Sequence, residues 1–495
     1  MFNEVTVSST NQVDMAPFTP WLPSHSTQDF DLVVKVVGQG ASQLFTEWIP
    51  LAHILIDHGL TVMAQRQRLN GDSGDFVLHL RMAVQPFYSM GHGCDVLVHV
   101  GDHAPEFWRF DLQPGSVLLW EAPAERPLYP IVPEGVITYP LPLSDLSDPY
   151  GEGVSGKGLA ALGVLLHLLG CPEEALHRVT PLLAAPRSFA AGIEFARHEI
   201  VKRDVYCLPL PAVDGGQSRF LLPPEQAMML GFALSFCECG TGCDRELLQS
   251  PADWMSRHLG IAGGMVSVLE SERQPGMQVF RGPQEEVVAL LGADDRAMMS
   301  CLAGVQAPRI LAAADVTDVV KLLIEGHDLI RRGLSGGVAV LVEDVVAMRH
   351  QSVDLSALIE MVRPRGSDVL DAVVTVQSDL PVTSADRDRE GGADVGFVSW
   401  GADQGVVRDA VGLCRNFGLN VAGLYPKVLV PLPQEELEMF ARTVKRVVLV
   451  ESSQSQGYGE RLREACSFQP AVLTPLPGKS LTPMDIFLRE GLGVV

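Results

Sequence analysis

Residues 236–243 read FCECGTGC and place three cysteines within seven positions of a chain that contains nine. Three thiolates this close together could bind zinc or an iron–sulfur cluster, because both prefer thiolate ligands. Cys237, Cys239 and Cys243 have no second pair of cysteines nearby that would complete a four-ligand site. The alternative is a turn between two helices that carries reduced thiols, and we expect no metal at this loop.

A second candidate is the pair of carboxylates in ESE at 270–272, which ends the apolar run GMVSVLESE. The run predicts a strand, and ligands of α/β units bind at the carboxyl ends of strands. Glu270 and Glu272 are two positions apart, so they project from the same face of that strand. The alternative is an ordinary solvated strand end.

Two glycine-containing turns lead from a predicted strand into a predicted helix, GQGAS at 38–42 and WGADQG at 400–405. The N-terminus of a helix favours phosphate groups, so GQGAS could serve a nucleotide. However, Gln43 stands where a dinucleotide fingerprint requires its third glycine, and the next strand ends without an acidic residue. A tight turn is the simpler interpretation, and a nucleotide-binding protein that uses GQGAS stays a weaker alternative.

The elements that must position these residues alternate between strands and helices, which predicts an α/β protein with parallel sheets. The length of 495 residues predicts about three domains. We expect an N-terminal arm, a first α/β unit, a second α/β unit, a linker and a third α/β unit, at 1–30, 31–208, 217–378, 379–392 and 393–490 respectively.

The composition excludes several classes of partner. The formal net charge is −23, which repels nucleic acid and anionic membrane surfaces. No apolar run is long enough to span a bilayer, and the N-terminal residues lack the pattern of a secretory signal. Nine irregularly spaced cysteines then favour reduced thiols, and we expect a cytoplasmic protein.

Taken in order, the three units resemble the fused γ–α subunit of 2-oxoacid:ferredoxin oxidoreductases. The third unit is similar to the transketolase-like C-terminal domain of the α subunit through VSWGADQGVVRDAV, LVPLPQEEL and VVLVESSQSQGYGERLR. The first unit is similar to the γ domain through VVGQGASQ, GLTVMAQ and GLAALGVLLHLLGCPEEAL. The fused order is found in many 2-oxoglutarate enzymes of this family.

The middle unit resembles a shortened pyrimidine-binding domain. LLPPEQAMMLGFALSF is similar to the helix that opens this domain, and CGTGCDRE stands where the family has its substrate loop, with Thr241 as the available hydroxyl. The resemblance places Glu272 at the carboxylate that contacts the thiamine aminopyrimidine, with Glu270, Thr241 and Gly401 as further cofactor contacts. The family's Thr-Ser-Gly-Pro-Gly segment is missing after Glu272, and a section of the domain is deleted.

The resemblance implies a division of the cofactors between two chains. Thiamine diphosphate with Mg²⁺ would be shared with a separate β subunit that also carries a [4Fe–4S] cluster, so that this chain acts in a hetero-oligomer. The implied reaction decarboxylates a 2-oxoacid, with 2-oxoglutarate as the expected substrate, reduces ferredoxin and transfers the acyl group to coenzyme A. The alternative, favoured by the missing segment, is a non-catalytic paralogue that serves as an assembly or scaffold subunit.

Overall fold

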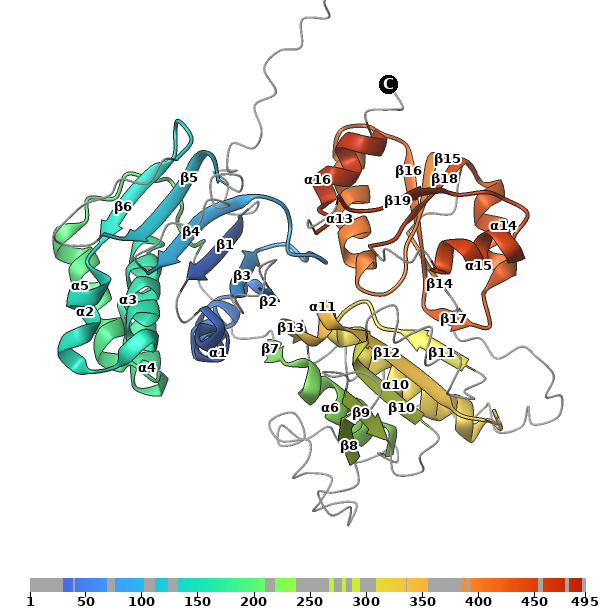
Figure 1. The fold of residues 1–495 in the computed structure, drawn as a ribbon, viewed down its shortest axis with the longest axis horizontal. Helices are drawn as coiled ribbons and strands as arrows, with labels where there is room; N and C mark the ends of the chain where they lie inside the picture. The colour runs from blue at the N-terminus through green and yellow to red at the C-terminus, as the bar shows by residue number, and fades with distance from the viewer. Residues whose placement is uncertain are drawn as a thin grey trace, which may run out of the picture.

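The structure is a computed structural model, and it describes residues 30–38, 41–68, 76–101, 112–122, 132–209, 219–236, 267–270, 278–281, 287–293, 309–334, 336–354, 385–388, 392–452, 457–476 and 480–491. Within these ranges the chain forms three β-sheets, and helices pack against each of them (Figure 1). The predicted α/β class with parallel sheets is therefore confirmed, with antiparallel strands added to each sheet. Among the described residues, no helix is both long and apolar enough to cross a bilayer.

The first sheet has the strand order β6-β5-β4-β1-β3-β2-β13-β7. Its strands are β1 Asp31–Gly38, β2 Thr61–Arg68, β3 Phe76–Ala83, β4 Cys94–Val100, β5 Leu112–Glu121, β6 Ile137–Leu141, β7 Arg219–Leu222 and β13 Arg349–Asp354. The sequence predicts a βαβ start at residue 31, and β3 lies between the two strands of that unit because it pairs antiparallel with both β1 and β2. Strand β3 follows β2 in the chain and pairs antiparallel with it, so it takes the position beside β1 that a simple βαβ unit would give to β2.

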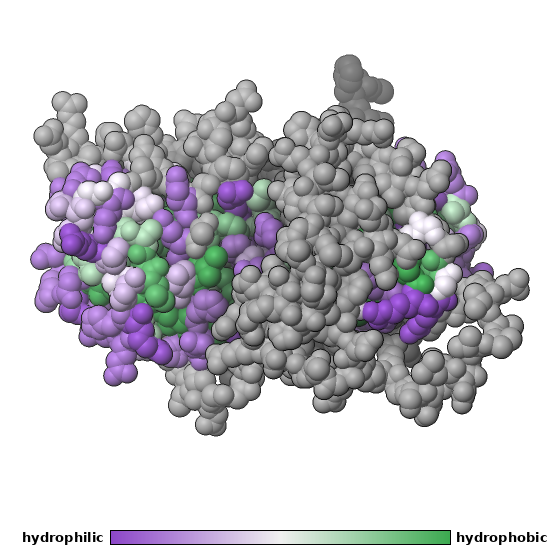
Figure 2. Space-filling view, turned by 90° about the horizontal axis from the view of Figure 1, so that it is seen from below, coloured by the Kyte–Doolittle hydropathy of each residue, from purple (hydrophilic) through white to green (hydrophobic). Residues whose placement is uncertain are grey.

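Within the described ranges, five helices cover the first sheet, and their apolar side chains contribute to its main core. They are α1 Ala41–Asp57, α2 Leu143–Ser147, α3 Gly153–Leu168, α4 Glu173–Val179 and α5 Pro186–Glu199. Helices α3 and α5 cross closely, because Gly163 faces the backbone of Phe189 and Gly192 faces the backbone of Ala160. From below, the outer surface of this unit shows a band of apolar residues bordered by hydrophilic ones (Figure 2).

The second sheet has the order β17-β11-β12-β10-β9-β8. Its strands are β8 Ser267–Glu270, β9 Gln278–Arg281, β10 Val287–Ala293, β11 Arg309–Ala312, β12 Val338–Glu343 and β17 Val428–Val430, and its helices are α6 Pro224–Phe236, α10 Val316–Arg331 and α11 Asp344–Ala347. Helix α10 begins after Asp315, whose carboxylate accepts a hydrogen bond from the N–H of Asp318 at 2.9 Å. This N-cap satisfies one of the unpaired donors of the first turn.

The third sheet has the order β14-β16-β15-β18-β19, with helices on both faces. Its strands are β14 Ala385–Arg387, β15 Ala393–Val398, β16 Val421–Pro426, β18 Val444–Val450 and β19 Ala471–Leu473, and its helices are α13 Asp403–Asn416, α14 Gln434–Arg442, α15 Gly457–Ala465 and α16 Pro483–Ile486, followed by a π-helical turn at Phe487–Gly491. The strands expected in this unit all form, and β14 lies inside the segment expected as a linker.

Strands cross between the units that the sequence pattern separates. Strands β7 and β13, expected in the middle unit, extend the first sheet through β2. Strand β17, from the third unit, pairs antiparallel with β11 of the second sheet. The three units are therefore joined through backbone hydrogen bonds as well as side chains, and they meet at one junction.

Candidate functional site

The sequence-predicted site residues are only partly described. Glu270 ends β8, the edge strand of the second sheet, and its backbone pairs with that of Gln278 on β9. Glu272, Thr241 and the cysteines of the 236–243 loop lie outside the described residues. The proposed roles of these residues therefore stay predictions.

Gly401 lies in the turn between β15 and α13, with a φ of 57° that disfavours any residue with a Cβ. The space that a side chain would need is filled by the carboxylate of Glu343, the last residue of β12. This carboxylate accepts a hydrogen bond from the N–H of Ala402. The turn that we expected to contact a cofactor thus holds a carboxylate from the second sheet, and this contact accounts for the glycine.

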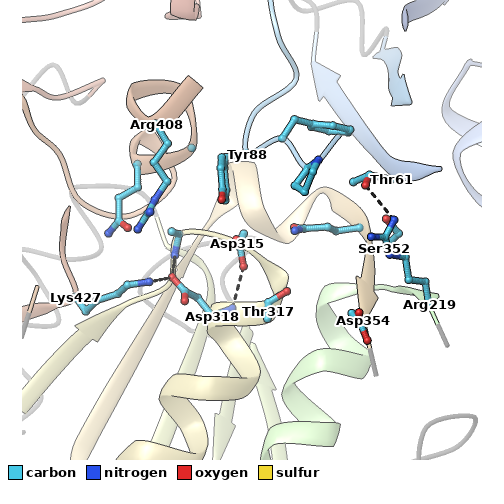
Figure 3. A pocket seen from close by; sticks show the side chains of 16 residues that line it. Thr61, Tyr88, Arg219, Asp315, Thr317, Asp318, Ser352, Asp354, Arg408 and Lys427 are labelled. Carbon is cyan, nitrogen blue, oxygen red and sulfur yellow. Dashed lines mark hydrogen bonds and ion pairs between the residues drawn. The ribbon is translucent and has the colours of Figure 1, made fainter. Parts of the chain in front are cut away.

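A pocket of about 350 Å³ lies at the junction of the three sheets (Figure 3). Residues from all three units line it: Thr61, Pro86, Phe87, Tyr88, Arg219, Gln351, Ser352 and Asp354 from the first sheet and its loops, Ala314, Asp315, Thr317 and Asp318 from the start of α10, and Gln404, Gly405, Arg408 and Lys427 from the third unit. None of these positions was among our predicted site residues.

Lys427 and Asp318 form a buried ion pair at one side of this pocket, as Figure 3 shows. Lys427 is 4% exposed, and the Asp318 carboxylate also accepts a hydrogen bond from the N–H of Ala314 at 3.2 Å. Lys427 lies between β16 and β17, so the pair joins the third unit to the first turn of α10. A buried charge needs such a partner, because an unpaired one is strongly destabilising.

Asp315 lies beside this pair, and the pKa of its carboxyl group is raised. Burial raises the pKa of the Asp315 carboxyl, and the neighbouring Asp318 carboxylate raises it further. The hydrogen bond from Asp318 N–H and the positive charges of Lys427 and Arg349 act in the opposite direction. The sequence signal for this site was the N-cap pattern Asp315-x-x-Asp318, which predicts a helix start but not a pocket.

Arg349 is a buried cation at the same junction. It is 3% exposed, its Nε and Nη2 donate to the side-chain oxygen of Gln65 at 3.4 and 3.2 Å, and its Nη1 has no hydrogen-bond partner among the described residues. Burial lowers the pKa of its guanidinium, whereas the charges of Asp315, Asp409 and Glu343 raise it. Carboxylates from the second sheet and the third unit therefore surround this cation.

Asp409 of α13 forms the contact between the first and third units. Its carboxylate accepts hydrogen bonds from Arg81 Nη1 at 2.9 Å, from the N–H groups of Tyr88 and Ser89 at 3.2 and 3.0 Å, and from the Ser89 hydroxyl at 2.6 Å. The same Arg81 guanidinium binds Asp31 at 2.9 and 2.6 Å. This network holds α13, and with it Gln404 and Arg408, against the pocket.

No group of three His, Cys, Asp or Glu side chains that could hold a metal ion lies within the described ranges. Together with the filled turn at Gly401, this means that the described part of the chain does not by itself fit the diphosphate and Mg²⁺ of a thiamine cofactor. The predicted contacts at Glu272 and Thr241 fall outside that part. We therefore derive no reaction step through the cofactor.

Comparison with known proteins gives one family match and several similar solved structures. Residues 393–475 match the family described as pyruvate:ferredoxin oxidoreductase core domain II. Among solved structures, the chain is similar to that of 2-oxoglutarate:ferredoxin oxidoreductase from Magnetococcus marinus, solved with 2-oxoglutarate, coenzyme A and succinyl-CoA bound. The identity is 19%, the TM-score is 0.73, and the match covers 94% of this chain and 100% of that chain.

A second similar structure is the γ subunit of the keto/oxoacid ferredoxin oxidoreductase from Geobacter sulfurreducens PCA, with 19% identity and a TM-score of 0.27 over 34% of this chain and 97% of that one. A search of curated proteins finds no significant match. The likeness to the Magnetococcus chain shows that this chain has the same overall fold. It extends over all three units and the junction between them.

Proposed function

We propose that this chain is a subunit of a 2-oxoacid:ferredoxin oxidoreductase and acts together with a separate β subunit. The proposal rests above all on one observation, the shared fold over 94% of the chain with an enzyme that binds 2-oxoglutarate, coenzyme A and succinyl-CoA. The match of residues 393–475 to the core domain II family supports it independently. The proposed reaction converts a 2-oxoacid and coenzyme A into an acyl-CoA and CO₂ and passes two electrons to two oxidised ferredoxins, with 2-oxoglutarate as the expected substrate.

The proposal divides the cofactors between the two chains. Thiamine diphosphate would supply the carbanion chemistry that decarboxylation of a 2-oxoacid needs. The family resemblance implies that the diphosphate, Mg²⁺ and a [4Fe–4S] cluster are held by the β subunit, and we adopt this division. This chain would contribute the Glu272 carboxylate, with Glu270, Thr241 and Gly401 nearby.

The junction gives this chain a second task, which is to hold three units in one arrangement. The pairs Lys427–Asp318 and Arg81–Asp409 and the contact of Glu343 with Ala402 each join two different units. Partly buried ion pairs with several hydrogen bonds hold their geometry better than exposed ones. Such a scaffold would present the carboxyl ends of the second sheet's strands to a partner subunit at a constant spacing.

A non-catalytic scaffold subunit is the second candidate. The observation that favours it is the Glu343 carboxylate, which fills the turn at Gly401 that we expected to contact the cofactor. The absence of Thr-Ser-Gly-Pro-Gly after Glu272 favours it as well. Such a subunit would assemble with the same type of partner and would support no turnover.

Anaerobic affinity purification of the full chain from its native lysate tests both candidates. We expect a β-type partner to co-purify, with a visible absorption spectrum of an iron–sulfur cluster and with bound thiamine. The complex should reduce ferredoxin only when both a 2-oxoacid and coenzyme A are present, and acyl-CoA should form in proportion. A complex that contains the partner but shows no turnover with any 2-oxoacid would favour the scaffold, and recovery of the chain as a monomer without a partner would contradict both.

A further inference from the structure

The junction pocket contains a buried acceptor that no described residue satisfies. Gln404 is 0% exposed and lines the pocket, and its Nε2 donates to the carbonyl oxygen of Pro426 at 3.1 Å. A carbonyl can only accept, so this bond fixes the orientation of the amide and leaves Oε1 as the free atom. Gln404 Oε1 has no hydrogen-bond partner among the described residues. A buried acceptor left without a donor costs free energy, so the pocket favours an occupant that carries an N–H or O–H group.

A second unsatisfied acceptor lines the same pocket. The Oε1 atom of Gln351, on β13 of the first sheet, is buried and has no partner in the described ranges. Gln351 lines the pocket from the first sheet and Gln404 lines it from the third unit, so the two acceptors belong to different units. An occupant with more than one donor would satisfy both.

The charges around the pocket are balanced. Three cationic side chains, Arg219, Arg408 and Lys427, line it together with three acidic ones, Asp315, Asp318 and Asp354. Figure 3 shows Arg408, Lys427 and Asp318 on one side and Arg219 and Asp354 on the other. Such a lining suits an occupant with both a positive and a negative group, and it disfavours a polyanion, as does the net charge of −23.

The aromatic rings near the pocket are covered by guanidinium groups. Arg408 lies over the ring of Tyr425 at 4.1 Å and over that of Tyr88 at 5.5 Å, and Arg81 lies over Phe87 at 4.3 Å. These faces are therefore occupied by cation–π contacts. A nucleotide base could not stack on the ring faces that these guanidinium groups cover.

Gln404 and Arg408 are four residues apart on α13, so they lie one turn apart on the same face of the helix. A molecule whose ammonium and carboxylate groups sit on one carbon atom could contact both side chains at once. The hydroxyl of Thr317, in the first turn of α10, has no hydrogen-bond partner among the described residues and lines the same space. It adds a donor for the carboxylate or for a polar side chain.

We propose that the junction pocket binds a small zwitterion of the α-amino acid class, with its ammonium donating to Gln404 Oε1 and its carboxylate against Arg408 and Thr317. The volume of about 350 Å³ accommodates a side chain as well, and Gln351 would accept from a donor on that side chain. A 2-oxoacid has a carboxylate but no N–H group, so the same pocket discriminates against it. The site is thus distinct from a 2-oxoacid substrate site and does not rest on the proposed function.

Calorimetry and thermal unfolding of the full purified chain, without a partner, test this proposal. The first probes are the L-amino acids. For each amino acid that binds, the corresponding 2-oxoacid, which lacks the ammonium group, and the corresponding amine, which lacks the carboxylate, are tested as well. We expect at least one amino acid to raise Tm, since a ligand that binds only the folded state stabilises it. The matching 2-oxoacid and amine should bind at least about tenfold more weakly, as expected for the loss of a hydrogen bond to a charged group.

Two variants and a matched control locate the site. Gln404→Met removes the acceptor and should weaken binding about tenfold. Thr317→Val should weaken binding with little cost to folding, because this hydroxyl has no hydrogen-bond partner among the described residues. Gln434→Met is the control, since Gln434 also donates its Nε2 to a carbonyl, that of Ala465, but lies on α14 away from the pocket. Its affinity should equal that of the wild type.

Three results would overturn the proposal. The first is that no amino acid binds, which would mean that water fills the pocket. The second is equal affinity in Gln404→Met, Thr317→Val and wild type. The third is that a 2-oxoacid or adenosine 3′,5′-bisphosphate binds more tightly than any amino acid and that Gln404→Met abolishes this binding. This result would assign the pocket to another class of ligand. Because the isolated chain is used, none of these results bears on the assembly with a β subunit.

Discussion

Arg81 on β3 and Asp409 on α13 form an ion pair at 2.9 Å, although 328 residues separate them in the sequence. Burial lowers the pKa of Arg81, but its hydrogen bonds and charge pairing with Asp31 and Asp409 more than offset this, so its pKa is raised. Both side chains are largely shielded, with 11% and 15% of their surface exposed. Together with the hydrogen bonds from Tyr88 and Ser89 to the same carboxylate, this pair links the first unit to the third.

Asp409→Ala should therefore weaken the docking of the third unit. The substitution leaves Arg81 with one carboxylate and removes the acceptor for the N–H groups of Tyr88 and Ser89, so we expect a loss of about 3 kcal/mol in the free energy of unfolding. Urea unfolding measures it. The control is Asp394→Ala, which breaks the exposed pair with Lys445 and should leave the midpoint almost unchanged. Equal effects of the two substitutions would contradict the role of the Arg81–Asp409 pair.

Gly401→Ala should lower the free energy of unfolding by more than is expected for an alanine at a position with positive φ. A Cβ at Gly401 would collide with the Glu343 carboxylate, whereas a Cβ at Gly418, which also has a positive φ of 78°, meets no atom within 4 Å. We expect Gly418→Ala to cost about 1 kcal/mol and Gly401→Ala about twice that or more. In a Glu343→Ala background the two glycine substitutions should differ less, and an unchanged difference would show that Glu343 is not the obstacle.

The stability should rise with pH between about 4 and 6.5, in part because of His350. Burial and, to a smaller extent, the charge of Arg66 together lower the pKa of His350 from 6.5 to about 4. The unfolded chain therefore binds a proton in this range that the folded chain does not, and acidification costs about 3 kcal/mol from this residue. His350→Phe keeps the ring that stacks on Phe45 at 4.1 Å and should flatten the slope.

Urea unfolding at pH 5 and pH 7 measures this pH dependence in the wild type and in His350→Phe. Burial and the charge of Arg331 lower the pKa of His327 to about 4 as well, so His327 should preserve part of the slope. Replacement of the exposed His177 by Phe is the control for the loss of a histidine. A steeper or unchanged slope in His350→Phe would contradict the assignment.

Glu272→Gln tests the catalytic version of the proposed function. If Glu272 is the carboxylate that contacts the aminopyrimidine, replacing it by Gln should lower the turnover of the complex by a factor of roughly 10²–10⁴. This range is typical for the loss of a general acid–base group. The amount of complex recovered should not change. Glu270→Gln is measured beside it, because the sequence pattern predicts both carboxylates on one face of a strand and Glu270 could take the same role. Full activity in both variants would leave the scaffold subunit as the better proposal.

The elements of this fold follow from local patterns. Nearly continuous apolar runs such as DLVVKVVG and VGFVSW predict buried strands. Both runs form strands that are buried on both faces, because helices or neighbouring units cover both faces of their sheets. The Asp315-x-x-Asp318 pattern predicts the start of α10. The order of the three units and their resemblance to a known family also came from the sequence, because each unit carries its own run of strand, turn and helix.

Only the tertiary structure decided which units share a sheet and which side chains meet. Strand β3 lies between β1 and β2, and β7 and β13 leave the middle unit for the first sheet, since any exposed strand edge can accept a strand and no local pattern selects one. The junction depends on partners far apart in the chain, such as Glu343 with Ala402 and Lys427 with Asp318. Such pairs leave no periodic signal, so the pocket around Gln404 emerged only when the three units were packed together.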